Sequence, residues 1–162
     1  MGEREKTGVL FVCLGNICRS PLAEGVFLHL ARERGAEGLF VVESCGTGGW
    51  HVGELPDRRS QAVAKKNGIV LPSRARKLDP FDDFRRFEWI IAMDRQNRRD
   101  VIAEGGEKGR VHLLRSFDAT LAGRPEAEMD VPDPYYGADG GFDEVFEMVM
   151  RGCEGLLERL RA

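Results

Sequence analysis

The chain lacks any long apolar run, and its 162 residues include only two tyrosines, two tryptophans and three histidines. None of its apolar stretches reaches the roughly 20 residues that a membrane-spanning helix needs. The first residues, MGEREKTG, are charged and contain no apolar core, so they do not have the pattern of a secretory signal. We therefore expect a cytoplasmic protein that makes no contact with a membrane.

Positive charge is not in excess, since 24 Lys and Arg residues face 27 Asp and Glu residues, for a net charge of −3. This balance gives no sign of a nucleic-acid partner. Of the four cysteines, Cys13 and Cys18 lack a second Cys or His pair at ligand spacing, so no metal site is expected. A disulfide framework is not expected in a cytoplasmic chain either, and Cys45 and Cys153 are interpreted as small core residues.

Strand-like and helix-like segments alternate along the chain. Short apolar runs predict buried strands at 8–13, 38–46, 87–94 and 110–117. Capping and stop signals predict helices at about 20–35, 57–68, 94–104 and 142–160, with Asp57 and Asp94 as the N-caps of the second and the third. Strands separated by helices imply βαβ units and a parallel sheet with helices on both faces. We expect one three-layer α/β/α domain over residues 1–162, with a flexible N-terminus at 1–7 and an irregular stretch at 116–141.

The segment CLGNICRS, residues 13–20, lies between the first predicted strand and the first predicted helix. Sites in open parallel sheets form beyond the carboxyl ends of the strands, and a helix N-terminus attracts anions. The backbone N–H groups of this segment can surround a tetrahedral oxyanion, and Gly15 and Asn16 both tolerate the positive φ that such a curl needs. Ser44 ends the second strand and is expected to hold Asn16. Ser20 is expected to cap the helix, with Pro21 as its first residue.

A cysteine at the mouth of such a loop is stabilised as a thiolate, which makes Cys13 a candidate nucleophile. Arg19 can bind two phosphate oxygens at once, which a lysine cannot do. The hydroxyl of Ser20 can donate to the sulfur and help it to leave. These residues suit attack on a phosphate ester, with transfer of phosphorus to sulfur and then to water. The nucleotide-binding patterns GxxxxGK[ST] and GxGxxG are absent.

Breaking a phosphate ester needs a proton for the leaving oxygen, and a carboxylic acid can supply it. Asp133 in VPDPYYG is the preferred candidate, because flanking prolines stiffen the backbone and two tyrosines follow. Asp130 and Asp139 remain as alternatives for this role.

Aromatic residues near these candidates suggest a slot for a flat leaving group. Tyr135 and Tyr136 directly follow the preferred acid, and Trp50 lies in the glycine-rich GTGGWHVG. His51 is interpreted as a surface histidine without a catalytic role, because the proposed chemistry does not need it.

Four segments together resemble the low-molecular-weight protein tyrosine phosphatases: VLFVCLGNICRSPLAEG, SCGTGGWHVGELPDRRS, FEWIIAMDRQNRRD and DVPDPYYG. They occur in order and span nearly the whole chain. The resemblance implies a four-stranded parallel sheet and hydrolysis of phosphotyrosine in proteins or of small aryl phosphates. It implies inorganic phosphate as product and inhibitor, no metal or other cofactor, and a monomer or weak homodimer.

The resemblance also implies roles for individual residues. Cys13 would be the nucleophile, Arg19 the phosphate clamp, and Asp133 the acid and then the base. Cys18 would form a disulfide with Cys13 under peroxide, which is a form of redox regulation. Ser73 stands where some members carry a histidine. The remaining implied residues are the phosphate-binding loop Leu14, Gly15, Asn16, Ile17, Cys18 and Ser20, the support Ser44, and the substrate rim Trp50, Tyr135 and Tyr136.

Three other functions fit parts of the pattern. A thioredoxin-coupled arsenate reductase of this fold needs a further cysteine pair near RKLDPFDDFRRFEW, where no cysteine occurs. A phosphocysteine carrier must keep its phosphate, and Asp133 would hasten hydrolysis. A phosphotyrosine-binding module usually loses the nucleophile, the arginine or the acid, and all three are present here.

Overall fold

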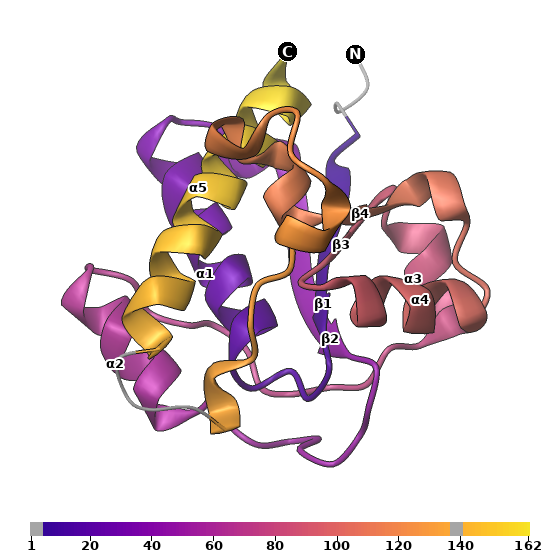
Figure 1. The fold of residues 1–162 in the computed structure, drawn as a ribbon, viewed down its shortest axis with the longest axis horizontal. Coiled ribbons are helices and arrows are strands. Elements are labelled where there is room, and N and C mark those ends of the chain that lie inside the picture. The colour runs from indigo at the N-terminus through magenta and orange to yellow at the C-terminus, as the bar shows by residue number, and fades with distance from the viewer. Residues whose placement is uncertain (1–4, 137–140) are drawn as a thin grey trace.

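Parallel strands form the centre of the computed structural model, which describes residues 5–136 and 141–162 (Figure 1). The strands are β1 (Thr7–Cys13), β2 (Phe40–Gly46), β3 (Trp89–Ala92) and β4 (Val111–Leu113). They form one sheet in the order β2-β1-β3-β4, and every neighbouring pair is parallel. The predicted four-stranded parallel sheet is therefore confirmed.

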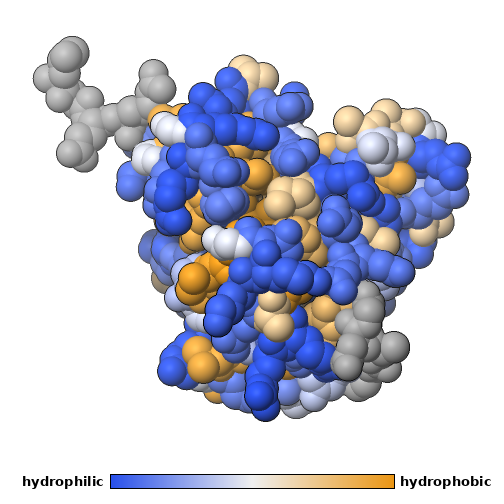
Figure 2. All heavy atoms as spheres, turned by 90° about the vertical axis from the view of Figure 1, so that its left-hand side faces the viewer, coloured by the Kyte–Doolittle hydropathy of each residue, from blue (hydrophilic) through white to orange (hydrophobic). Residues whose placement is uncertain are grey.

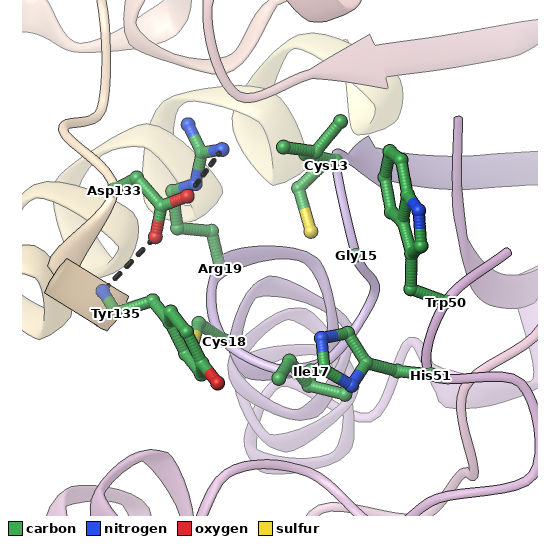
Figure 3. Close-up of a pocket in the computed structure, with 10 residues that line it drawn as sticks. Cys13, Gly15, Ile17, Cys18, Arg19, Trp50, His51, Asp133 and Tyr135 are labelled. Carbon is green, nitrogen blue, oxygen red and sulfur yellow. Dashed lines mark hydrogen bonds and ion pairs between the residues drawn. The ribbon is translucent and has the colours of Figure 1, made fainter. Parts of the chain in front are cut away.

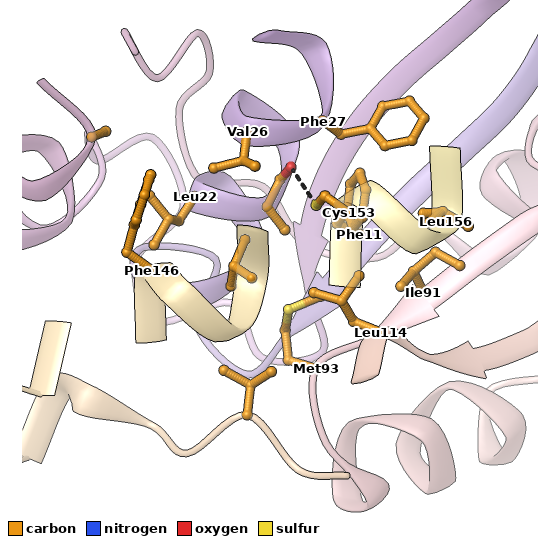
Figure 4. Close-up of a cluster of buried hydrophobic side chains, with 14 of the residues drawn as sticks. Phe11, Leu22, Val26, Phe27, Ile91, Met93, Leu114, Phe146, Cys153 and Leu156 are labelled. Carbon is orange, nitrogen blue, oxygen red and sulfur yellow. Dashed lines mark hydrogen bonds between the residues drawn. The ribbon is translucent and has the colours of Figure 1, made fainter. Parts of the chain in front are cut away.

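Helices cover both faces of this sheet, as predicted. One face carries α1 (Arg19–Glu33), α2 (Arg58–Lys66) and α5 (Gly141–Arg161), and the other carries α3 (Pro80–Arg86) and α4 (Arg95–Ala103) (Figure 1). Because side chains alternate along a strand, Phe11 and Ile91 join the core under α1 and α5 (Figure 4). Leu10 and Ile90 join the second core, under α3 and α4.

The outer surface of the helical layer is polar. Figure 2 shows mostly hydrophilic residues on the face that lies at the left of Figure 1, where α2 and α5 run. The helix α5 buries Val145, Val149 and Leu156 on its inner side, as its predicted apolar spacing requires. Within the described ranges, no helix combines the length and the apolar character needed to cross a membrane.

Several predicted element ends are wrong by a few residues. The strand predicted at 110–117 ends at Leu113, because Leu114–Phe117 turn into a 3-10 helix. The Ser116 hydroxyl donates to the carbonyl of Leu113 at 2.6 Å, and this local bond favours the turn over further strand. At the other end of the sheet, Thr7 pairs with Phe40, so β1 begins inside the segment that was expected to be flexible.

The helix α3 has no counterpart among the predicted ranges. Its start carries a clear signal all the same, since the Asp79 carboxylate accepts from the N–H groups of Phe81 and Asp82, and Pro80 is the first helical residue. At seven residues the helix is too short to show a helical period in the sequence.

The long stretch after β4 contains several 3-10 turns that are tied to the rest of the fold. Arg151 on α5 pairs with the buried Asp118 at 3.1 Å. The guanidinium of Arg115 donates to the carbonyl of Asp130 at 3.2 Å, and the N–H of Val131 donates to the carbonyl of Met93 at 2.8 Å. These contacts lead the chain across the carboxyl end of β3 and toward the end of β1.

Candidate active site

The loop that follows β1 surrounds the sulfur of Cys13. This side chain ends the strand and is only 2% exposed. The backbone N–H of Asn16 donates to Sγ at 3.3 Å, and the hydroxyl of Ser20 lies 2.9 Å from it. Donors of this kind favour the charged thiolate over the thiol. The loop thus has the form that the sequence predicts for an anion site.

Asn16 holds the loop in its curled form. Its φ of 57° lies in the left-handed region, as predicted, and its side chain is buried. The amide nitrogen Nδ2 donates to Ser20 at 2.7 Å and to Ser44 at 3.0 Å, so the expected contact with Ser44 is present. The amide oxygen Oδ1 accepts from the backbone N–H of Arg76 at 3.0 Å. These bonds offset the cost of the unusual backbone conformation.

Of the two residues that tolerate positive φ, only Asn16 adopts it, and Gly15 does not. A different constraint favours glycine here. A Cβ at Gly15 would lie 3.1 Å from Cδ2 of His51, so the ring of the histidine packs against the bare backbone of the loop. A side chain at this position would push the histidine away from the loop.

The sequence suggested Ser20 as the cap of the first helix, and this prediction is wrong. The helix α1 begins at Arg19, and its N-cap is Cys18, which makes no side-chain capping bond. The hydroxyl of Ser20 is instead engaged with Cys13 and Asn16. The N–H groups of the first helical turn therefore remain available to an anion in the loop.

Arg19 is buried beside the sulfur and is held from behind. Its Nη1 donates to Oδ2 of Asp94 at 2.6 Å and to the carbonyl of Val131 at 2.9 Å. Burial by itself lowers the pKa of Arg19, but the neighbouring Cys13 and Asp94 outweigh it and raise that pKa above its ordinary value. The guanidinium is thus a fixed, permanent cation. The sequence predicted Asp94 only as the N-cap of α4, which it also is, through the N–H of Asn97.

The structure brings one of the three candidate acids into the cleft. Oδ2 of Asp133 lies 3.6 Å from Nη2 of Arg19, and Oδ1 accepts from the N–H of Tyr135 at 3.0 Å (Figure 3). The Asp130 carboxylate instead accepts hydrogen bonds from the backbone N–H and the guanidinium of Arg95, and Asp130 does not line the cleft. Asp139 lies outside the described residues.

The cleft has a volume of about 300 Å³, and Trp50 and Tyr135 form aromatic parts of its wall. The Cys13 sulfur points into the space bounded by Trp50 and Tyr135 (Figure 3). Trp50 is 72% exposed and Tyr135 38% exposed, which leaves both rings accessible to a ligand. The side chain of Tyr136 lies outside the described residues. The residues that line the cleft are Cys13, Leu14, Gly15, Ile17, Cys18, Arg19, Trp50, His51, Asp133 and Tyr135.

His51 lines the cleft, a position that the sequence did not predict. Its ring lies 6.1 Å from the ring of Tyr135, and its Nδ1 is 2.8 Å from a carboxylate oxygen of Glu54. The signal in the sequence that could have indicated this position is that His51 directly follows Trp50 in a glycine-rich segment. Because the carboxylate can only accept, it places the proton of a neutral imidazole on Nδ1.

Glu24 is a second residue that the sequence did not single out. It is 4% exposed, and its Oε1 accepts from the hydroxyls of Ser44 at 2.6 Å and Ser73 at 2.7 Å. Burial raises the pKa of Glu24, and the two hydroxyls offset part of this effect. Ser73 therefore reaches the loop through Glu24 and Ser44. Nothing in the local sequence PLAEG, residues 21–25, marks Glu24 as a buried residue.

The cysteines differ strongly in environment. Cys18 is buried at the other end of the loop, where burial and the nearby Asp57 raise its pKa to about 12. Burial raises the pKa of Cys45 and of Cys153 still further, and both belong to the cores, as predicted. None of the four cysteines forms a disulfide.

Known proteins resemble the chain along nearly its whole length. The family model described as low molecular weight phosphotyrosine protein phosphatase matches residues 8–162. The human protein of that name is 37% identical over 163 residues, which cover 98% of this chain and 99% of the human one. A protein tyrosine phosphatase structure from Entamoeba histolytica has a TM-score of 0.88 at 34% identity and covers 96% of this chain and 97% of that one. A Drosophila arginine phosphatase structure has a TM-score of 0.84 at 29% identity and covers 95% and 98%.

Proposed function

The chain belongs to the low molecular weight phosphotyrosine protein phosphatase family, and we propose that it hydrolyses phosphotyrosine through a phosphocysteine intermediate on Cys13. The family membership confirms the resemblance found in the sequence and makes the chain a protein tyrosine phosphatase. The proposal adds the chemical steps of the reaction and the residues that carry them out. A phosphotyrosine-containing protein and small aryl phosphates are the substrates, and inorganic phosphate is the product and an inhibitor.

The observation that carries this proposal is that Cys13, Arg19 and Asp133 share one cleft around an anion-binding loop. A phosphate seated in the loop accepts from the backbone N–H groups and from Arg19. Its phosphorus then faces the Cys13 sulfur at the base of the cleft. A guanidinium that is already anchored by Asp94 loses little freedom when it binds the phosphate, and this favours the transition state.

In the first step the Cys13 thiolate attacks phosphorus, and the bond to the tyrosine oxygen breaks. Asp133, in its protonated form, donates its proton to that oxygen, so the product leaves as neutral tyrosine. The carboxyl group is partly exposed at the rim, where the leaving oxygen of a bound substrate lies. Trp50 and Tyr135 provide the walls for the aromatic ring.

In the second step water attacks the phosphorus of the phosphocysteine. Asp133, now a carboxylate, takes a proton from the water, and the sulfur leaves as a thiolate. The Ser20 hydroxyl, 2.9 Å from Sγ, donates to the departing thiolate and lowers the barrier for this step. Inorganic phosphate is released, and the loop is ready for another substrate.

Release of inorganic phosphate from a phosphotyrosine peptide tests the proposal directly. The wild type is compared with Cys13→Ser and Asp133→Ala at mildly acidic pH, with reductant and without metal. Loss of the nucleophile is expected to abolish turnover. Loss of the acid is expected to lower kcat by roughly 10²- to 10⁴-fold, the usual contribution of a positioned proton donor.

Other outcomes would assign the chain differently. Unchanged kcat in Asp133→Ala would move the acid to Asp130 or Asp139. Phosphate that stays on Cys13 would support a carrier, and binding without reaction would support a phosphotyrosine-binding module. A phosphoarginine peptide and arsenate are run in parallel, and preference for either would overturn the proposed substrate class.

A further inference from the structure

A cluster of charged residues lies behind the loop and takes no part in the proposed chemistry. At its centre, the Arg76 guanidinium forms a two-pronged ion pair with Asp83: Nη1 to Oδ2 and Nη2 to Oδ1, each at 2.9 Å. The Asp83 side chain, on α3, is only 1% exposed, and its carboxylate also accepts from the N–H of Asp79 at 2.8 Å. Glu43 on β2 pairs with the same guanidinium at 3.1 Å.

The backbone of Arg76 connects this cluster to the loop. Its N–H donates to Oδ1 of Asn16 at 3.0 Å, and its carbonyl accepts from the N–H of Gly46 at 2.8 Å. The guanidinium and the backbone of one residue are thus fixed at the same time, the first by α3 and β2 and the second by the loop. A continuous series of contacts leads from the buried Asp83 to the nucleophile.

The contact with Arg76 decides which way the Asn16 amide faces. A backbone N–H can only donate, so the amide must turn its oxygen toward Arg76 and its NH₂ group toward Ser20 and Ser44. Ser20 then accepts from Asn16, and its own hydrogen can go to Cys13 at 2.9 Å, with the carbonyl of Cys45 as a more distant second acceptor at 3.4 Å. If the amide turned over, its oxygen would compete for that hydrogen, and the thiolate would lose a donor.

We propose that Asp83 is a positioning residue for the nucleophile: by holding Arg76 it fixes the Asn16 amide and so keeps the Ser20 hydroxyl directed at Cys13. The inference rests on the proposed role of Cys13. It assigns to α3, an element without any residue in the cleft, a function in the reaction. Loss of the anchor leaves the backbone of Arg76 free to shift, and the thiolate is then less well stabilised.

Two substitutions of opposite charge test this proposal. Asp83→Asn removes an anion and Arg76→Gln removes a cation, and both break the anchor. An effect of charge alone would favour the Cys13 thiolate in the first variant and disfavour it in the second. Positioning predicts that both variants disfavour it. Asp118→Asn is the matched control, because Asp118 is also 1% exposed, pairs with one arginine and accepts a backbone N–H, yet lies away from the loop.

The readout is the pH dependence of Cys13 alkylation by iodoacetamide, with mass spectrometry to locate the label. On the rising part of the wild-type pH profile, both anchor variants are expected to react about three- to tenfold more slowly than wild type, since a hydrogen bond to a charged group contributes this much or more. They are expected to lower kcat for a phosphotyrosine peptide by a similar factor, with little change in KM. Asp118→Asn is expected to lower the unfolding midpoint without slowing the alkylation of Cys13.

Opposite shifts in the two anchor variants would overturn the proposal in favour of a purely electrostatic effect. Shifts no larger than those of Asp118→Asn would reduce the cluster to a structural role. If Asp83→Asn does not fold, Glu43→Gln takes its place, because it removes another anion from the same guanidinium. Slower alkylation of Cys13 is again expected, and faster alkylation would overturn the proposal. Alkylation needs no turnover, so a wild type that is alkylated but releases no phosphate would refute the proposed function alone.

Discussion

At the scale of single residues, the polar groups around the nucleophile form a chain of hydrogen bonds that ends at a buried carboxylate. Cys13 contacts Ser20, Ser20 contacts Asn16, and Asn16 contacts Ser44. Ser44 donates in turn to Glu24, which only accepts when it is ionised. The protonation state of Glu24 therefore bears on both the stability of the fold and the order of the site.

The raised pKa of Glu24 predicts a definite pH dependence. Because the folded state holds the proton more tightly than the unfolded chain, the stability from this group is fully present below the ordinary Glu pKa. It is lost as pH rises through the raised value. Glu24→Gln keeps an oxygen acceptor but cannot ionise. We expect the free energy of unfolding of wild type, relative to this variant, to fall in urea titrations as pH rises above the ordinary Glu pKa of about 4.3. A difference that is constant with pH would contradict the assignment.

Cys18 gives a second prediction at this scale. With its pKa raised to about 12, it is a neutral thiol at physiological pH and is not expected to be alkylated. It still lines the same cleft as Cys13. Peroxide oxidises the Cys13 thiolate to a sulfenic acid, which a neighbouring thiol converts to a disulfide with loss of water.

We expect wild-type activity to return after peroxide treatment once a dithiol is added, because the dithiol reduces that disulfide. Cys18→Ser should stay inactive, since its sulfenic acid is oxidised further to forms that thiols do not reduce. Intact-mass measurement distinguishes the disulfide from the added oxygens. Equal recovery of the two proteins would rule out the protective role that the family resemblance implies.

At the scale of elements, helix N-caps connect the fold to the site. Asp57 caps α2 and Asp94 caps α4, and both were predicted from the sequence. Asp94 differs because its other oxygen accepts from Arg19. Asp94→Ser keeps a side chain that can cap a helix but removes the partner of the guanidinium.

We expect Asp94→Ser to lower kcat/KM for a phosphotyrosine peptide by roughly 10- to 100-fold, the usual effect of losing a hydrogen bond between charged groups, with a small change in Tm. Asp57→Ser is the matched control, since it alters a cap in the same way but Asp57 makes no contact with Arg19 in the described structure. A similar loss of activity in both variants would mean that capping, and not the hold on Arg19, is responsible.

These elements also show what a sequence can and cannot predict. The loop 13–20 and the caps depend on neighbours within a few residues, so their residue types reveal them. The second role of Asp94 depends on Arg19, which is 75 positions away, and the support from Arg76 comes through a backbone N–H, which has no residue type. The place of His51 in the cleft wall could not be predicted for a related reason, because only the folded segment brings its ring against Gly15.

At the scale of the whole molecule, the cleft depends on how α5 and the segment after β4 pack together. In the sheet order β2-β1-β3-β4, the chain adds β2 on one side of β1 and β3 on the other, so the strand order reverses at β1. Open parallel sheets form their sites at the carboxyl ends of the strands at such a point. The segment that carries Asp133 reaches this point from the 3-10 helix Leu114–Phe117, against which α5 packs. Close packing there has a consequence for both stability and activity.

Two glycines in α5 permit this packing. A Cβ at Gly152 would lie 2.6 Å from the Leu114 side chain, and one at Gly155 would lie 1.7 Å from the carbonyl oxygen of Phe117. An alanine inside a helix is ordinarily about 1 kcal/mol more favourable than a glycine. At Gly155 the clash is with backbone, which cannot rotate away, so α5 and the 3-10 helix must separate.

We therefore expect Gly155→Ala to lower the free energy of unfolding by about 1–3 kcal/mol in urea titrations, as overpacking of a core does. Gly25→Ala in α1 is the control, because the close contacts of its Cβ would be with side chains, Leu71 at 2.7 Å and Ile69 at 3.3 Å, and the end of the Leu71 side chain can move. Separation at Phe117 also shifts the start of the segment that leads to Asp133. In Gly155→Ala we expect kcat to fall while the pH dependence of Cys13 alkylation is unchanged, because the loop after β1 does not contact α5 at this point. A change in alkylation as large as the change in kcat would show instead that α5 supports the loop itself.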